Sequence, residues 1–138
     1  MRSNKILEHT ADIRLQVEGD SLKELFAAAL EGMNKILITD GCTTSEKNGQ
    51  NELIEITATN PTTLLIDFLS EILTRSHINH LIYCEIEFKE MTEISLKVEI
   101  TGTRVDSFYE DIKAVTYHEA DVQKSAEGNY QTVIIFDI

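Results

Sequence analysis

Apolar and polar residues alternate along several stretches of the chain, as is typical of strands that bury one face. The alternation covers residues 13–17, 82–88 and 94–100. Residues 89–92 form a short break between the last two stretches, so we expect an antiparallel hairpin there with one face in water. Residues 133–136 are apolar at every position, which predicts a central strand that is buried on both faces.

Two other stretches have the period of an amphipathic helix. The first begins after Ser21, an N-cap residue that Glu24 follows three positions later, as in a capping box. Its apolar stripe is Leu22, Leu25, Phe26, Ala29, Met33 and Ile36. The second begins with Asn60 as the cap and Pro61 at the first helical position. Its apolar stripe is Leu64, Leu65, Phe68, Leu69 and Ile72.

The order of these elements predicts a single α+β domain over residues 1–138. We expect a mostly antiparallel sheet with the two helices packed on one side of it. Residues 41–51 are polar and contain two glycines, which predicts an exposed loop within that domain. Residues 125–129 are a second polar break and indicate a turn between two strands.

The net charge narrows the classes of partner. The 138 residues include 24 acidic and 12 basic ones, so the chain carries a charge of −12 at pH 7. A surface this acidic repels phosphate groups, which argues against stand-alone binding to nucleic acid. A basic protein partner or divalent cations fit the charge better. No stretch approaches the ~20 consecutive apolar residues of a membrane span.

The cysteines and the amino end predict a location. Residues 1–5 lead into a charged segment and lack the apolar core of a signal peptide. Cys42 and Cys84 lie far apart and have no metal-ligand spacing, so we expect buried small side chains or idle thiols. Both features fit a reducing, cytoplasmic location.

Two charged residues stand where the pattern predicts partial burial. Asp12 precedes the strand at 13–17, where it is either a metal ligand or anchor for a catalytic base, or an ordinary carboxylate at a strand start. Lys113 shares a period-two face with Val115 and Tyr117. A lysine among apolar neighbours needs a carboxylate partner or loses its proton. The alternative is a lysine at a strand end whose side chain reaches water.

The carboxyl end of the chain carries the most specific pattern. Asp137 follows the apolar run, and Ile138 ends in a free carboxylate, so two carboxylates lie one residue apart. Like charges this close repel each other unless a cation lies between them, and oxygen ligands suit calcium or magnesium better than zinc. The alternative is a frayed, solvated terminus. His77 and His80 are three residues apart; they form either a pair at a helix end or, more simply, part of a loop.

Four segments in sequence order resemble the archease family. They are His9-Thr10-Ala11-Asp12-Ile13, Gly19-Asp20-Ser21-Leu22, residues 113–118 (KAVTYH) and Phe136-Asp137-Ile138. The likeness spans essentially the whole chain and implies a strand-helix-strand-strand core that carries an inserted segment. Two features depart from the family: Tyr130 stands where a tryptophan is common, and residues 103–112 lack the usual histidine.

The resemblance also implies a function. Archeases are protein cofactors of the RtcB-type RNA ligase that joins exons in tRNA splicing, and they promote the GTP- and metal-dependent guanylylation of the ligase and its multiple turnover. They have also been regarded as chaperone-like modulators of tRNA-modifying enzymes. The family's metal-binding positions match Asp12, Asp137 and Ile138, with calcium as the associated ion. Lys113 matches a lysine that is required for activation together with the two aspartates.

The sequence therefore leaves three hypotheses for the function. The first is a non-enzymatic activator of an RNA ligase, which would contact RNA only through the ligase. The second is a small metal-dependent hydrolase that uses Asp12 as base and Asp137 to hold the metal. The third is a structural or chaperone module that uses an apolar patch. An enzyme is expected to enclose its site in a concave pocket, whereas an activator should present it on a protrusion.

Overall fold

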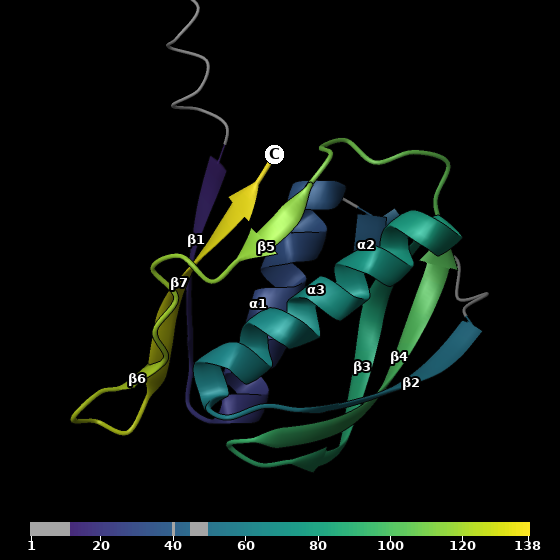
Figure 1. Cartoon of the computed structure of the whole chain (residues 1–138). Helices are drawn as coiled ribbons and strands as arrows, with labels where there is room; N and C mark the ends of the chain where they lie inside the picture. Colours follow the sequence, from purple (N-terminus) through teal and green to yellow (C-terminus); the bar gives the residue numbers. More distant parts are fainter. Residues whose placement is uncertain (1–11, 40, 45–49) are drawn as a thin grey trace, which may run out of the picture.

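The computed structural model describes residues 12–39, 41–44 and 50–138 of the chain (Figure 1). The elements in chain order are β1 (Asp12–Gly19), α1 (Leu22–Leu37), α2 (Gly41–Thr44), β2 (Gln50–Thr57), α3 (Pro61–Asn79), β3 (Leu81–Met91), β4 (Ser95–Arg104), β5 (Ala114–Thr116), β6 (Gln123–Lys124) and β7 (Tyr130–Asp137). Residues 9–11 of the first family-like segment and residues 45–49 of the polar loop lie outside the described residues.

The strands form two antiparallel sheets rather than one. Sheet A has the order β1-β7-β5, and β6 also pairs with β7. Sheet B has the order β2-β4-β3. The α+β class with antiparallel pairing is confirmed, and the strand at 133–136 lies between neighbours as its apolar sequence predicted. Sheet A comes from the beginning and end of the chain, whereas sheet B and α3 come from the segment between α1 and β5.

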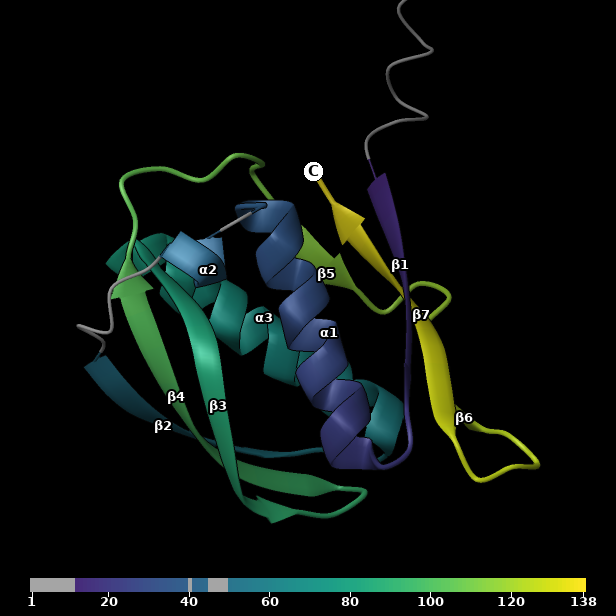
Figure 2. The same ribbon diagram turned by 180° about the vertical axis from the view of Figure 1, so that it is seen from behind.

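The helices lie between the two sheets (Figures 1 and 2). Helix α1 contacts β1 and β3, and helix α3 contacts β3 and β5, so each helix touches both sheets. The rings of Phe26 in α1 and Phe68 in α3 join the helices, with centroids 5.4 Å apart. Each sheet thus turns one face to the helices and the other to solvent. No helix in the described ranges is long and apolar enough to cross a membrane.

Local sequence sets the boundaries of both long helices. The Ser21 hydroxyl accepts a hydrogen bond from the Glu24 N–H (3.2 Å), and the Asn60 side chain accepts one from the Thr63 N–H (2.8 Å). These bonds satisfy N–H groups that the first helical turn leaves without a partner, which confirms both predicted caps. Helix α3 runs to Asn79, further than expected. It ends there because His80 adopts the left-handed conformation.

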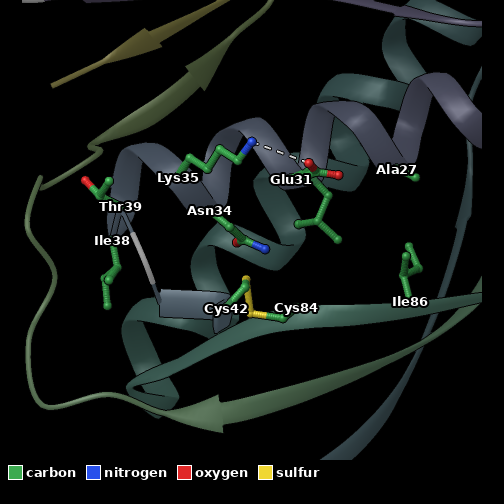
Figure 3. A pocket seen from close by; sticks show the side chains of 10 residues that line it. Ala27, Glu31, Asn34, Lys35, Ile38, Thr39, Cys42, Cys84 and Ile86 are labelled. Carbon is green, nitrogen blue, oxygen red and sulfur yellow. Dashed lines mark ion pairs between the residues drawn. A yellow bond between two sulfur atoms is a disulfide. The ribbon is translucent and has the colours of Figure 1, made fainter. Parts of the chain in front are cut away.

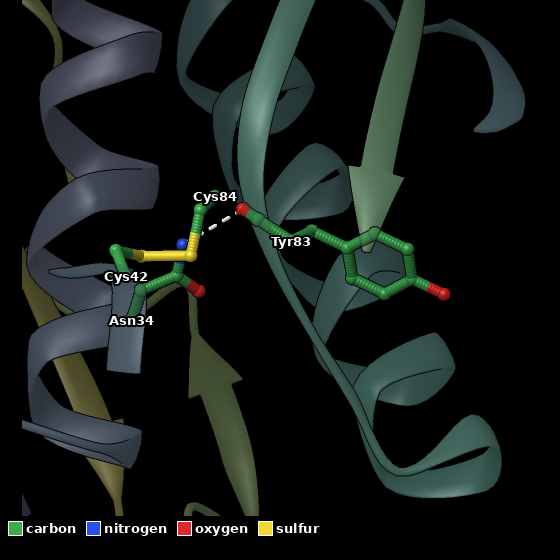
Figure 4. The surroundings of a disulfide bond; sticks show 4 residues. All are labelled: Asn34, Cys42, Tyr83 and Cys84. Atoms are coloured by element: carbon green, nitrogen blue, oxygen red, sulfur yellow. Dashed lines mark hydrogen bonds between the residues drawn. A yellow bond between two sulfur atoms is a disulfide. The ribbon is translucent and has the colours of Figure 1, made fainter. Parts of the chain in front are cut away.

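The prediction that the two cysteines are buried side chains or idle thiols is wrong. Cys42 in α2 and Cys84 in β3 form a disulfide with their Cα atoms 5.5 Å apart (Figure 4). The spacing in the sequence gave no sign of this contact, because it depends on where α2 is placed beside sheet B. Idle thiols therefore no longer argue for a reducing compartment.

Candidate functional site at one end of sheet A

Pairing of β1 with β7 brings Asp12 and Asp137 together. The strands are antiparallel, and Asp12 lies directly opposite Asp137 in the register. Side chains directly opposite on neighbouring strands have Cβ atoms roughly 4.5–5.5 Å apart. Figures 1 and 2 show the end of β7 beside the start of β1. We call Asp12, Asp137, Lys113 and Ile138 the acidic sheet end.

The two aspartates project from the solvent face of sheet A. Both are exposed, whereas the next pair in the register, Ile13 and Phe136, packs into the core between sheet and helices. The alternation of side chains along a strand puts Asp12 and Asp137 on the face opposite to that pair. Phe136 is fully buried and Ile138 packs against the core. The carboxyl end is therefore not frayed.

Lys113 reaches the same end of the sheet from the other side of β7. Ala114 in β5 pairs with Asp137, and the Lys113 N–H donates a hydrogen bond to the Asp137 carbonyl oxygen (2.7 Å). Asp137 is therefore held by β1 on one side and by the start of β5 on the other. The Lys113 side chain is exposed, and Val115 behind it is buried. This is the strand-end arrangement, not a lysine enclosed by apolar neighbours.

The charges of the acidic sheet end have no partners within the described ranges. No hydrogen bond or ion pair joins the side chains of Asp12, Asp137 or Lys113 to any residue that the structure describes there. Like charges directly opposite across a strand pair destabilise the sheet. Two facing carboxylates are hard oxygen donors, so their chemistry fits a calcium or magnesium ion.

The described side chains do not complete a metal site by themselves. Across residues 12–39, 41–44 and 50–138, no three His, Cys, Asp or Glu side chains gather as a metal ion would require. Among these side-chain types in the described ranges, Asp12 and Asp137 thus supply two donor groups. Ile138, directly after Asp137, can add main-chain oxygens.

A second group of polar residues, which sequence reasoning missed, joins α3 to sheet B. We call Glu52, Glu71, Arg75, Asn79 and Tyr83 the Tyr83 cluster. The Arg75 guanidinium contacts the Glu52 carboxylate (3.0 Å) and the Glu71 carboxylate (2.7 Å). The Tyr83 hydroxyl donates to Glu52 and accepts a hydrogen bond from the Asn79 side chain (3.2 Å).

The environment of the Tyr83 cluster favours the neutral phenol. Burial, and next the hydrogen bond to the Glu52 carboxylate, raise the pKa of Tyr83 from 10.0 to about 12. Both glutamates bond to Arg75, and Glu52 also bonds to Tyr83. The cluster therefore links β2, α3 and β3. One part of it has a sequence signal: Glu71 and Arg75 are spaced i,i+4 on a helix. Glu52 and Tyr83 come from separate strands, which no spacing indicates.

Two cavities in the described part of the chain are lined by other residues. One lies between α1 and β3, with Leu30, Lys35 and Ile86 in its walls (Figure 3). The other lies beside the start of α1 and includes Asp20 and Glu24. Neither includes Asp12, Lys113 or Asp137. The acidic sheet end is an exposed end of two paired strands.

Sequence comparison relates the chain to known proteins. The model of the Archease protein family matches residues 5–138. Protein archease of Pyrococcus abyssi is 32% identical over 138 residues, covering 95% of this chain and 95% of that protein. Protein archease of Methanosarcina acetivorans is 30% identical over 140 residues, covering 96% of this chain and 93% of that protein.

Solved structures support the same fold. The crystal structure of a Thermotoga maritima archease, described as a possible chaperone, has a TM-score of 0.68 at 21% identity and covers 100% of this chain and 98% of that one. The solution structure of a Methanobacterium thermoautotrophicum protein has a TM-score of 0.71 at 23% identity, with 93% of each chain covered. At these identities the likeness concerns the fold alone.

Proposed function

The chain belongs to the archease family, and from that premise we propose that it is a non-enzymatic activator of an RtcB-type RNA ligase in tRNA splicing. It promotes the GTP- and metal-dependent guanylylation of the ligase and so allows multiple turnovers. It contacts RNA only through the ligase, and it works in the cytoplasm. The net charge of −12 fits this role, since an acidic protein is repelled by RNA but attracted to the basic surface of an RNA-binding enzyme.

One observation carries the proposal beyond family membership: Asp12 faces Asp137 at an exposed strand end, with Lys113 hydrogen bonded through its main chain to the same residue. The three residues that the family resemblance assigns to activation thus meet at one place. The fold holds this place from both sides of β7. It projects into solvent, where another protein can reach it.

We propose that the acidic sheet end holds a divalent cation, with calcium as the ion. The Asp12 and Asp137 carboxylates and a main-chain oxygen of Ile138 are the ligands that this chain contributes. Such oxygen donors suit a hard cation of flexible coordination. When bound, the ion would offset the repulsion between the two carboxylates and make the end of sheet A less negative toward its partner.

The activator acts by binding, and the ligase carries out the chemistry. The acidic sheet end enters the metal- and guanylate-binding cleft of the ligase and binds the reactive arrangement of that cleft more tightly than the unreactive one. An effector can shift an equilibrium only by the difference between its affinities for the two states. Lys113 contributes an ammonium group that can contact a phosphate or a carboxylate of the partner.

A guanylylation assay tests the proposal. The ligase is incubated with limiting GTP and a divalent metal, and the covalent ligase–guanylate is followed with and without this protein at a substoichiometric ratio. We expect faster guanylylation with wild-type protein and with Glu18→Gln. We expect a loss of roughly tenfold or more in stimulation with Asp137→Asn, if the carboxylate interaction contributes at least about 1.4 kcal/mol to the preferred state.

Glu18→Gln is the matched control because Glu18 lies on the same solvent face of sheet A, at the opposite end of β1, and loses the same charge. Equal stimulation by wild type and Asp137→Asn would remove the acidic sheet end from the mechanism. Absence of stimulation by the wild type would contradict the ligase role itself. Phosphate or nucleotide hydrolysis by the protein without the ligase would support the hydrolase instead.

A further inference from the structure

The cavity between α1 and β3 has a volume of about 330 Å³ and opens onto the Cys42–Cys84 disulfide (Figure 3). Leu30 and Ile86 provide apolar wall, and both cysteines belong to the lining. Cys42 is exposed and Cys84 is half-buried. A disulfide in this position differs from one enclosed by the core, because a thiol of small size can approach a sulfur atom along the cavity.

The buried amide beside the disulfide is incompletely bonded. Asn34 is 2% exposed, and its Nδ2 donates a hydrogen bond to the Tyr83 carbonyl oxygen (2.8 Å). Its Oδ1 is buried and has no partner among the residues that the structure describes. Figure 4 shows the Asn34 amide next to the Cys42–Cys84 bridge. A buried carbonyl without a donor is unfavourable.

Reduction of the bridge would supply the missing donor. A disulfide has no hydrogen to donate, whereas each thiol carries one S–H. A cysteine thiol beside Asn34 can therefore donate to its Oδ1 in the dithiol form only. This extra hydrogen bond makes reduction of the bridge more favourable than it would be if Asn34 were already fully bonded. Such a bridge is suited to reversible reduction.

The bridge is connected to the acidic sheet end through the main chain. It ties α2 to β3, and α2 follows closely after Leu37, the last residue of α1. The Leu37 carbonyl oxygen accepts hydrogen bonds from the N–H groups of Tyr109 (2.7 Å) and Glu110 (3.4 Å). The segment that contains Tyr109 and Glu110 continues to Lys113, which bonds to Asp137.

We propose that Cys42–Cys84 is a thiol–disulfide exchange site, reached through the α1–β3 cavity by a low-molecular-weight thiol, and that its reduction loosens the 105–113 segment that leads to Lys113. The apolar walls and the net charge of −12 favour a thiol without negative charge. The exchange reaction at this bridge does not rest on the proposed ligase role.

The reaction balances with two equivalents of thiol. The first thiolate attacks the sulfur of Cys42, the more exposed of the two residues. The Cys42–Cys84 bond breaks, a mixed disulfide forms on Cys42, and the Cys84 thiolate takes a proton from water. A second thiolate attacks the reagent sulfur of the mixed disulfide and releases Cys42 as a thiolate, which is protonated in turn. Two electrons pass from the two reagent thiols to the bridge, and the reagent leaves as its own disulfide.

The test uses the full chain and 2-mercaptoethanol as the probe, without denaturant. Alkylation and mass spectrometry are expected to find no free thiol in air-exposed protein, a transient adduct on Cys42, and two thiols in folded protein at the end. Amide hydrogen exchange at Tyr109 and Glu110 should become at least about tenfold faster after reduction, while that of Ile100 in β4 stays unchanged. The Cys42→Ser/Cys84→Ser variant should show the same faster exchange without reductant.

A variant of Asn34 separates this site from an ordinary structural disulfide. Asn34→Ala removes the side-chain carbonyl that a thiol could bond to. The equilibrium with 2-mercaptoethanol should therefore shift about tenfold toward the disulfide. Two free thiols in air-exposed wild-type protein, or reduction only after unfolding, would overturn the proposal. Equal rates of amide hydrogen exchange at Tyr109 and Glu110 in oxidised, reduced and double-serine protein would show that reduction does not loosen the 105–113 segment.

Discussion

The acidic sheet end and the Tyr83 cluster are both groups of charged residues, yet they differ in how their charges are bonded. In the Tyr83 cluster, Arg75 lies between two glutamates, and Tyr83 and Asn79 complete the hydrogen bonds. At the acidic sheet end, two like charges face each other across a strand pair without a bonded counter-charge in the described part of the chain.

This difference indicates what each group does. Charges that are bonded to each other and half-buried can stabilise the fold, and they leave fewer donors and acceptors for a ligand. Facing carboxylates without a partner reduce stability, so an exposed pair of this kind is better explained by something that binds to it. We therefore treat the Tyr83 cluster as a structural group for comparison, and the acidic sheet end as the candidate functional site.

The largest effect is expected from the Tyr83 cluster. Arg75→Met should lower the free energy of unfolding by about 2–3 kcal/mol, because Glu52 and Glu71 lose their counter-charge in a half-buried place. Urea unfolding measures this. Lys35→Met is the control: it breaks the exposed Lys35–Glu31 pair (3.4 Å) in α1 and should cost less than about 0.5 kcal/mol. Equal losses of unfolding free energy in both variants would mean that the cluster does not stabilise the fold more than an exposed ion pair does.

Alkaline pH should weaken the same cluster. The folded state raises the pKa of Tyr83 from 10.0 to about 12, so the folded protein keeps the phenolic proton over a range in which the unfolded chain releases it. The stabilisation is complete below pH 10.0 and disappears as the pH rises to about 12, with a slope of at most about 1.4 kcal/mol per pH unit. Unfolding of wild type and Tyr83→Phe between pH 9 and 11 measures it. Parallel curves would contradict the raised pKa.

Calcium should act on the acidic sheet end alone. With free calcium tenfold above its dissociation constant, the free energy of unfolding of wild type should rise by about 1.4 kcal/mol. Asp137→Asn should show little of this gain, whereas Arg75→Met should show all of it on a lower baseline. Calorimetric titration provides the dissociation constant. Identical gains in wild type and Asp137→Asn would place the ion elsewhere.

The smallest effect should have the opposite sign to the first. Without divalent ions, Asp12→Asn should raise the free energy of unfolding by about 0.2–1 kcal/mol, because it removes one of two facing like charges. The gain should shrink at high salt, which screens exposed charges. Chemical unfolding in the presence of a chelator measures it, with Glu18→Gln for comparison. A less stable Asp12→Asn would show that the carboxylates are already compensated.

Local sequence patterns predicted the two long helices with their caps and the strands β1, β3, β4 and β7, because neighbouring residues determine them, but they missed α2 and β2. Ser21 and Asn60 cap helices through atoms three residues away, and the run at 133–136 lies inside a sheet because it is apolar on both faces. The end of α3 was harder to place, since His80 adopts a conformation that histidine takes up only occasionally. The helix therefore includes His77, for which a loop was the simpler of the two interpretations.

Contacts between distant segments were predictable only in part. The alternation at 13–17 and the apolar final strand indicated two strands, and the family resemblance grouped Asp12 with Asp137, but the register that puts them opposite is seen only in the structure. The Cys42–Cys84 bridge was missed because it requires α2 to pack on β3. The division into two sheets was missed because alternation shows that a strand has a buried face, not which neighbour it pairs with.

Pairing of the first strand with the last has a consequence for how the protein is made. Sheet B and α3 are built from a continuous middle segment, and they can assemble while the rest of the chain is still being translated. Sheet A closes only when β7 has left the ribosome and found β1, a contact of high sequence separation and correspondingly slow formation. A nascent chain without β7 has no Asp137 opposite Asp12, so the proposed partner site forms only after β7 has been translated.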